Sequence, residues 1–252
     1  MEDITLDYTV TVNTVIEFDY FSTAEGEIQG LGFDRDDGIS SGYTFTVFGT
    51  QDWGNSTYET YDGNEGSWVH YKIDVGSFYQ GDFNRLFFVN DDDTYVGANG
   101  SYSNVAIYEA GSDAADTITG STGSQSLRGL GGDDLIYGMD GDDVLYGGSG
   151  IDFLFGGNGA DTFVFDDISD ADHVQDFDIN EGDVLDISSL LSGYDPVSDA
   201  IADFVMVTSD GTDTAVYVDG GADSFVQIAT LHGVTDLGSV EALEDSGVLI
   251  TV

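Results

Sequence analysis

Residues 129–165 read GLGGDDLIYGMDGDDVLYGGSGIDFLFGGNGADTFVF. Glycine-rich acidic segments alternate here with short apolar runs, and the pattern repeats every nine residues. The same spacing extends back to Gly111 and gives six consecutive frames. These are GSDAADTIT (111–119), GSTGSQSLR (120–128), GLGGDDLIY (129–137), GMDGDDVLY (138–146), GGSGIDFLF (147–155) and GGNGADTFV (156–164). Six tandem matches indicate a repeat architecture.

Three positions define the frames. Glycine opens all six, and position eight is apolar in every frame. Aspartate holds position six in five frames, and Gln125 replaces it in the second frame. The position-six aspartates are Asp116, Asp134, Asp143, Asp152 and Asp161, and the position-eight residues are Ile118, Leu127, Ile136, Leu145, Leu154 and Phe163.

Each frame has the composition of a turn followed by a short strand. The glycines allow positive φ angles and close approach of neighbouring backbones, which a tight turn requires. The three residues after position six form a strand whose middle side chain points inward. Two frames make one full coil, so alternate frames stack. We therefore expect two columns: Asp116, Asp134 and Asp152 in one, and Gln125, Asp143 and Asp161 in the other.

Stacked aspartates repel one another. Parallel strands lie about 4.8 Å apart, and two carboxylates at that distance repel by about 3.5 kcal/mol at an effective dielectric constant near 20. A divalent cation between neighbouring turns reverses the sign of this interaction. Carboxylate and peptide oxygens are the ligands that Ca²⁺ prefers, whereas Zn²⁺ favours His and Cys. The spacing therefore predicts several calcium ions between successive turns.

The arrangement resembles the RTX (repeats-in-toxin) parallel β-roll, a nine-residue repeat that binds Ca²⁺. Oxygens at position three, in Asp113, Asp140 and Asn158, fit as supporting ligands. Gln125 departs from the pattern and should weaken any site that it shares. A string of Asp-Gly hairpin turns without metal is the alternative interpretation, but it does not explain the common register of the frames.

Calcium at these sites is expected to be structural. Extracellular calcium modules have dissociation constants of about 10⁻⁴–10⁻³ M. At free calcium about tenfold higher, each site adds roughly 1.4 kcal/mol, so about four sites add roughly 5–6 kcal/mol. That sum is comparable to the whole stability of a small domain. We expect the repeats to be unfolded where calcium is scarce and folded outside the cell.

The segment after the repeats, DDISDADHVQDFDINEGDVLDISSLL (166–191), resembles the region that follows the rolls in type I secretion substrates. The acidic residues Asp176, Asp178, Asp183 and Asp186 are candidate ligands for further calcium, and a solvated acidic loop is the alternative. Residues 204–231 alternate apolar and polar side chains around two Asp-Gly turns, which predicts antiparallel hairpins that cap the roll. The end, EALEDSGVLITV (241–252), resembles an uncleaved type I export signal.

Composition limits the partners. The 252 residues include 49 acidic and 4 basic ones, for a net charge of −45. A nucleic-acid partner needs a basic patch, and an anionic membrane would repel the chain. A halophilic surface is an alternative reason for the charge, but not for its spacing. There is no cysteine, so disulfides do not stabilise the fold. No apolar run reaches the ~18 residues of a membrane helix, so we expect no membrane insertion.

The first part of the chain has a different rhythm. Runs that alternate apolar and polar side chains are separated by Gly, Asn and Asp turns. They cover residues 4–11, 15–21, 43–49, 68–75, 85–90 and 104–110. About seven strands in some 100 residues predict a β-sandwich, of jelly-roll type. The sequence therefore predicts an all-β protein with a β-sandwich at 1–110 and a parallel β-roll with its cap and export signal at 111–252.

Catalytic motifs are not evident. The sequence contains neither a nucleophile elbow, nor an HExxH motif, nor a phosphate-binding loop. A carboxylate pair for glycoside cleavage stays open, because carboxylates occur throughout the chain. We expect that this chain is not an enzyme.

Oxygen-rich segments beside aromatic residues mark the first part. Such segments suit sugar recognition, and this part resembles calcium-dependent carbohydrate-binding modules and lectin domains. The candidate sugar ligands are Glu25, Gln51, Trp53, Asn90, Asp91, Asp92, Asp93 and Asn99. Asp34, Asp36 and Asp37 are expected to hold a structural calcium. Trp68 heads an alternating strand and is expected to be buried, so Trp53 is the better candidate for stacking on a sugar.

Our first hypothesis is that the chain is a calcium-dependent glycan-binding region at the C-terminal end of a secreted or surface-attached RTX adhesin. Its partners would be an extracellular glycan and, during export, the type I secretion apparatus. A second reading is the tail of a secreted polysaccharide-degrading enzyme whose catalytic domain lies upstream. A third makes the first part a peptide-binding or structural spacer.

Overall fold

The computed structural model describes residues 2–23, 28–34, 43–48, 56–58, 61, 64–91, 100–221 and 224–252. Strands dominate these residues, so the expected all-β class is confirmed. The chain forms two compact units, Met1–Ile107 and Tyr108–Val252. This division lies close to the one that we drew between residues 110 and 111.

In the described residues, seven strands precede the repeats. They are β1 (Glu2–Val10), β2 (Thr14–Ser22), β3 (Ile28–Asp34), β4 (Thr44–Phe48), β5 (Trp68–Asp74), β6 (Gly81–Asp91) and β7 (Gly100–Ala110). One sheet has the order β1-β6-β3-β4 with antiparallel neighbours. In the other sheet β2 lies between β7 and β5, and it is antiparallel to β5.

The two sheets of the first unit share one aromatic core. Tyr20 of β2 donates a 2.6 Å hydrogen bond to Gln29 of β3, and Tyr102 of β7 donates a 2.7 Å bond to the carbonyl of Gly30. The rings of Phe88 and Tyr102 lie 4.7 Å apart. Side chains from strands of both sheets therefore pack against each other. The β-sandwich of jelly-roll type that the sequence predicts is more specific than this packing and stays a prediction.

Ile28–Asp34, which the sequence analysis did not assign to a strand, is a strand. Ile28–Asp34 forms β3, which lies between β6 and β4, and the end of β6 pairs with it at Asn90 and Asp91. The sequence prediction was wrong here because the apolar positions of IQGLGF were outweighed by the surrounding acidic residues.

The second unit contains the remaining strands. They are β8 (Thr117–Thr119), β9 (Ser126–Gly131), β10 (Leu135–Asp140), β11 (Val144–Ser149), β12 (Phe153–Asn158), β13 (Thr162–Val164), β14 (Asp172–Val174), β15 (Val184–Asp186), β16 (Val205–Ser209), β17 (Thr214–Asp219), β18 (Phe225–Leu231) and β19 (Leu249–Ile250). The short helices of this unit are α1 (Val240–Ser246) and the 3₁₀ turns Ser188–Leu190 and Ile201–Asp203. The first unit has the 3₁₀ turns Ser56–Tyr58 and Val75–Ser77. None of the helices in the described residues has the length and apolar character to cross a membrane.

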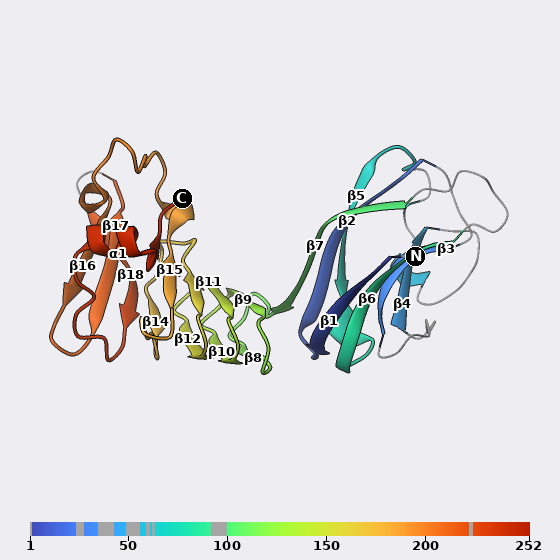
Figure 1. Ribbon diagram of the computed structural model, residues 1–252, viewed down its shortest axis with the longest axis horizontal. Coiled ribbons are helices and arrows are strands. Elements are labelled where there is room, and N and C mark those ends of the chain that lie inside the picture. Colours follow the sequence, from blue (N-terminus) through green and yellow to red (C-terminus); the bar gives the residue numbers. More distant parts are fainter. Residues whose placement is uncertain are drawn as a thin grey trace. The chain divides into compact units, whose positions relative to one another are not determined.

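The repeats form a parallel coil with two strands per turn (Figure 1). On one side β8, β10, β12 and β14 pair in parallel, and on the other side β9, β11, β13 and β15 do so. Paired residues in the repeats lie one coil apart, as in Ile136 and Leu154. The position-eight side chains are all fully buried between the two sides. The predicted β-roll is therefore confirmed.

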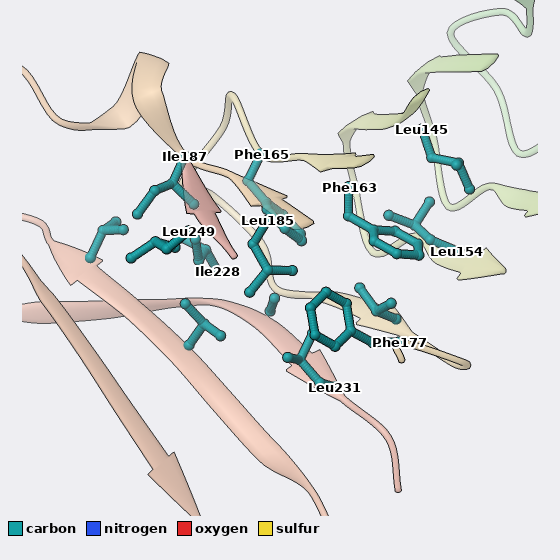
Figure 2. Close-up of a cluster of buried hydrophobic side chains, with 14 of the residues drawn as sticks. Leu145, Leu154, Phe163, Phe165, Phe177, Leu185, Ile187, Ile228, Leu231 and Leu249 are labelled. Atoms are coloured by element: carbon teal, nitrogen blue, oxygen red, sulfur yellow. The ribbon is translucent and has the colours of Figure 1, made fainter. Parts of the chain in front are cut away.

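An antiparallel cap follows the coil. β16, β17 and β18 form hairpins at the predicted turns, and β18 continues the sheet beside β14. Figure 2 shows Phe163 and Leu185 of the coil beside Phe177, with Leu231 of β18 and Leu249 of β19 in the same cluster. Leu249 is buried, and β19 pairs with β15. The apolar end that resembles an export signal is thus part of the folded core.

Candidate metal centre

The position-six aspartates form a hydrogen-bond ladder between successive coils. Oδ1 of Asp134 accepts a bond from the backbone amide of Asp116 at 2.7 Å, and Oδ1 of Asp152 accepts one from the amide of Asp134 at 2.8 Å. Asp172 continues the ladder by accepting from the amide of Asp152 at 3.0 Å. Each carboxylate therefore lies against the turn of the preceding coil.

The second column repeats this geometry and begins at Gln125. Oδ1 of Asp143 accepts from the amide of Gln125 at 2.7 Å, and Oδ1 of Asp161 accepts from the amide of Asp143 at 2.8 Å. Asp183 accepts from the amide of Asp161 at 2.9 Å. The two columns are those that the nine-residue spacing predicts.

The second carboxylate oxygen is buried without a partner at four position-six residues. These are the Oδ2 atoms of Asp134, Asp143, Asp152 and Asp161. Each of the four residues is at most 1% exposed. An ionised oxygen that is buried without a donor destabilises the fold by more than the roughly 1–3 kcal/mol of a neutral group. Because the feature recurs in both columns, it points to a positively charged ligand.

The first glycine of each frame leaves space beside these oxygens. A Cβ atom built on Gly138 would lie 2.5 Å from Oδ2 of Asp143 and 2.5 Å from the carbonyl oxygen of Gly156 in the next coil. A Cβ on Gly129 would meet Oδ2 of Asp134 and the carbonyl oxygen of Gly147. Any side chain at position one would therefore fill the space where a carboxylate oxygen and a peptide oxygen from two coils approach each other.

Backbone strain accompanies the turns. At position two, Gly148 and Gly157 have φ angles of 97° and 99°, but Leu130 and Met139 adopt 77° and 87°. A left-handed conformation costs a residue with a side chain about 1–2 kcal/mol. Non-glycine residues in such conformations cluster at functional sites. The stacking of the coils therefore imposes the turn even where the local sequence disfavours it.

Burial in the columns makes the ionised carboxylates unfavourable. Burial, followed by repulsion from neighbouring aspartates, raises the pKa of Asp134 and Asp161 to about 6 and that of Asp143 to about 7. The pKa of Asp172 is raised to about 8, chiefly by burial. The hydrogen bonds from backbone amides lower each of these pKa values but do not offset the burial. A bound cation would favour the ionised form.

The donor set fits calcium. Within the part of the chain that the structure describes, no three His, Asp or Glu side chains converge on one point. An ion here therefore draws most of its ligands from the peptide oxygens of the turns, together with the orphaned Oδ2 atoms. A set made of oxygens alone is suited to Ca²⁺ and poorly suited to Zn²⁺.

Two of the predicted supporting residues, Asp140 and Asn158, end strands β10 and β12. Asn158 donates a 2.7 Å hydrogen bond to Asp140 in the preceding coil, and both side chains are exposed. Asp113 is also exposed. Their role as ligands stays a prediction.

The predicted acidic residues after the repeats are held by backbone amides. Asp176 accepts bonds of 2.9 Å and 3.0 Å from the amides of Gly156 and Gly157. Asp183 accepts from Asp161 through one oxygen and from Asp178 through the other. Asp183 therefore has the same position as a sixth residue of a frame, although the repeat has ended.

Sequence reasoning missed Asp172. It is 7% exposed and completes the first column, but it follows Asp152 after 20 residues rather than 18. The signal that identifies it is an aspartate at the start of a short strand: Asp172 is the first residue of β14, and Asp161 and Asp183 directly precede β13 and β15. Strict counting in nines hides this signal.

The predicted ligands in the first unit lie outside what the structure describes. Glu25, Asp36, Asp37, Gln51, Trp53, Asp92, Asp93 and Asn99 fall outside the described residues. For Asp34, Asn90 and Asp91 the structure describes the backbone alone. Their roles stay predictions.

Comparison with known families supports the repeat assignment. Residues 110–145, 119–154 and 137–167 match the family described as RTX calcium-binding nonapeptide repeat (4 copies). No curated protein matches the chain.

The solved structures that are similar to this chain include two subunits of one enzyme. The AlgE6R3 subunit of the Azotobacter vinelandii mannuronan C5-epimerase is 36% identical, with coverage of 49% of this chain and 73% of that chain and a TM-score of 0.38. The AlgE6R2 subunit of the same enzyme is 31% identical, with coverage of 56% and 91% and a TM-score of 0.42.

Proposed function

We propose that the second unit is a folding module whose native state depends on extracellular calcium. Residues 110–167 match RTX calcium-binding nonapeptide repeats. The observation that carries this proposal is the set of four buried Oδ2 atoms without partners. Calcium, when bound, supplies the positive charge that neutralises carboxylates of successive coils.

The chain's own residues prepare this site. Backbone amides of one coil hold the Oδ1 atoms of the next, so each Oδ2 atom is fixed in place. Position-one glycines leave room for an ion, and the position-eight side chains supply the apolar core. The core alone must offset two columns of buried carboxylates, so the module is only marginally stable without calcium.

RTX repeats indicate a secreted protein. We infer that the chain leaves the cell by type I secretion in an unfolded state and folds where calcium is abundant. The absence of cysteine suits this route, because no disulfide has to form before the coil closes.

Arg128 offers a direct test. It is the only Lys or Arg in residues 108–252, and its guanidinium group lies between the rings of Tyr108 and Tyr146, 4.7 Å and 4.6 Å from their centroids. Trypsin cleaves after Arg and Lys, so in this unit it can cut only after Arg128. We expect slow cleavage at this bond in calcium and rapid cleavage in equal magnesium.

A calcium-insensitive substrate, added to the same reactions, measures trypsin activity. Equal rates of cleavage after Arg128 in calcium and in magnesium would refute the proposed folding function.

A second function is proposed for the first unit. We infer that it binds a glycan and that the two units together form the C-terminal end of a secreted or surface-attached adhesin. An aromatic pair on an exposed sheet face, Phe21 and Trp68, favours this function. We propose no catalysis for this chain.

The domains that accompany these two units in a longer protein would separate this function from the tail of a polysaccharide-degrading enzyme. Tandem β-sandwiches would support an adhesin, whereas a single catalytic domain would support an enzyme tail. A glycan array that stays silent with and without calcium would favour a spacer.

A further inference from the structure

Trp68 projects from the outer face of its sheet. Our expectation that it is buried was wrong: the side chain is 55% exposed. On β5 the side chains of Tyr71 and Ile73 point into the core. Trp68 lies three residues before Tyr71, so it shares the outer face with His70 and Lys72. An exposed tryptophan in this position is not explained by core packing.

A second aromatic ring holds Trp68 in place. Phe21 of β2 lies directly opposite Trp68 in the antiparallel register. The two ring centroids are 5.3 Å apart, and the planes are inclined at 37°. Cross-strand aromatic pairs of this kind stabilise a sheet and limit the freedom of both rings. The indole is therefore presented to solvent in a restricted orientation.

A polar cluster lies next along the same face. Asp19 is opposite His70, and its Oδ1 atom lies 2.9 Å from Nδ1 of His70. Asn104 of β7 donates a 2.6 Å hydrogen bond to Oδ2 of Asp19. These two hydrogen bonds lower the pKa of Asp19, so it remains an ionised acceptor. In the described part of the chain the side chains of His70 and Asn104 make no other hydrogen bond, which leaves Nε2 of His70 and Oδ1 of Asn104 for a ligand.

The backbone supports this placement. Asn104 has a φ angle of 52°, in the left-handed region that asparagine tolerates better than most residues. This conformation places its amide group on Asp19, across the strand pair. The cluster is therefore built by three strands, β2, β5 and β7.

We propose that the outer face of β2 and β5 binds a neutral saccharide. A sugar ring would lie against Trp68, and its hydroxyl groups would form hydrogen bonds with His70 and Asn104. His70 is two residues along β5 from Trp68, a distance of about 6.6–6.8 Å. The inference rests on the proposed glycan-binding function of the first unit and gives that function a location. It differs from the site predicted around Trp53.

The charges of this face determine the class of saccharide. Lys72 lies 3.4 Å from Glu17 and offsets its charge, whereas Asp19 contacts His70, which is charged only when protonated, so the face carries no excess of positive charge. The chain as a whole has a net charge of −45 and repels anions at long range. An uncharged ligand with many hydroxyl groups fits this combination better than a uronate or sulfated glycan.

The test uses the full chain in saturating calcium. The probes are an array of neutral oligosaccharides of glucose, galactose, mannose and N-acetylglucosamine, and an array of uronate oligosaccharides. We expect binding to a neutral probe, and Trp68→Ala should weaken it at least tenfold. Trp68→Phe should weaken it less, because an aromatic face remains, and His70→Ala should also weaken it.

Val12→Ala, at a 62% exposed side chain in the turn between β1 and β2, is the matched control and should leave binding unchanged, whereas Trp53→Ala tests the alternative site predicted around Trp53. Protection of Arg128 from trypsin verifies that each variant retains a folded second unit, and near-ultraviolet circular dichroism verifies the first. Binding that survives Trp68→Ala but is lost in Trp53→Ala would overturn the location and keep the glycan function. Preference for uronates would overturn the neutral class, and silence on both arrays would overturn the glycan function itself.

Discussion

The carboxylate of Asp152 accepts a 2.8 Å hydrogen bond from the backbone amide of Asp134, which lies one coil earlier in the chain. The other oxygen of Asp152 is buried and has no partner. One residue thus joins two coils through one oxygen and leaves the second as a site for a cation. The repetition of this relationship in both columns is the basis of the predictions below.

Loss of one position-six carboxylate should remove calcium stabilisation selectively. Asp143→Asn keeps an oxygen that can accept from the amide of Gln125, but it removes the charge. We expect a loss of about 1–2 kcal/mol of unfolding free energy at free calcium tenfold above the dissociation constant, and little loss in chelator. Urea unfolding measures both values.

Asp142→Asn is the matched control for this substitution. Asp142 carries the same charge in the same turn, but it is exposed, and its Oδ1 bonds to the amide of Ala160. An equal loss in both variants would show that net charge, and not the position-six oxygen, determines calcium binding.

Gln125→Asp should have opposite effects with and without calcium. Gln125 is 7% exposed, and its Nε2 atom is buried without a partner. An aspartate there extends the second column by one carboxylate, so the variant should be more stable than the native chain in calcium and less stable in chelator. Thermal unfolding in the two buffers measures this reversal of relative stability. A change in melting temperature of the same sign in both buffers would count against the site.

Acid should partly replace calcium. The pKa values of Asp143 and Asp172 are raised by burial to about 7 and about 8, above the value near 3.9 of an unfolded aspartate. A raised pKa contributes stability below the unfolded value, and this contribution is lost as the pH rises through about 7 to 8. In calcium-free buffer the urea midpoint should therefore be higher at pH 5 than at pH 8. A midpoint that rises from pH 5 to pH 8 would contradict the burial of ionisable columns.

Met139→Gly should stabilise the second unit. Met139 is 48% exposed and has a φ angle of 87°, so little packing is lost while the strain of about 1–2 kcal/mol is relieved. The greater freedom of glycine in the unfolded chain offsets part of this gain. We expect a net increase of several tenths of a kcal/mol or more in urea unfolding.

Gly157→Ala introduces at the paired position of the next coil the strain that Met139→Gly removes. Gly157 has a φ angle of 99°, and an added Cβ would overlap the carbonyl oxygen of Met139. Gly211→Ala, where φ is 89° and no atom lies within 4 Å of the Cβ, separates strain from overlap. Equal losses in the two alanine variants would contradict the close approach of successive coils.

The roll was predictable because its period is local. Each frame carries its turn, its position-six residue and its core residue, so counting from Gly129 was enough to assign both columns and the buried position-eight side chains. The orphaned Oδ2 atoms were not predictable in the same way. They depend on which amide of the preceding coil each carboxylate contacts, and only the structure gives that pairing.

The first unit was less predictable because its pairings are between distant parts of the chain. Trp68 was placed in the core by its alternating strand, yet the positions of Tyr71 and Ile73 already set the inward phase of β5. Similarly, Ile28–Asp34 was not predicted as a strand, although it pairs with β6, more than 50 residues away. Acidic composition hid the strand, and no local signal identifies its partner.

Calcium titration of the chain after removal of metal tests the central claim most directly. Far-ultraviolet circular dichroism should show the second unit gaining β-structure cooperatively between about 10⁻⁴ and 10⁻² M calcium, and excess chelator should reverse the change. Magnesium, added over the same range, should produce little of this change. A spectrum that is the same in chelator and in saturating calcium would contradict the claim that calcium ions stabilise the two columns of aspartates.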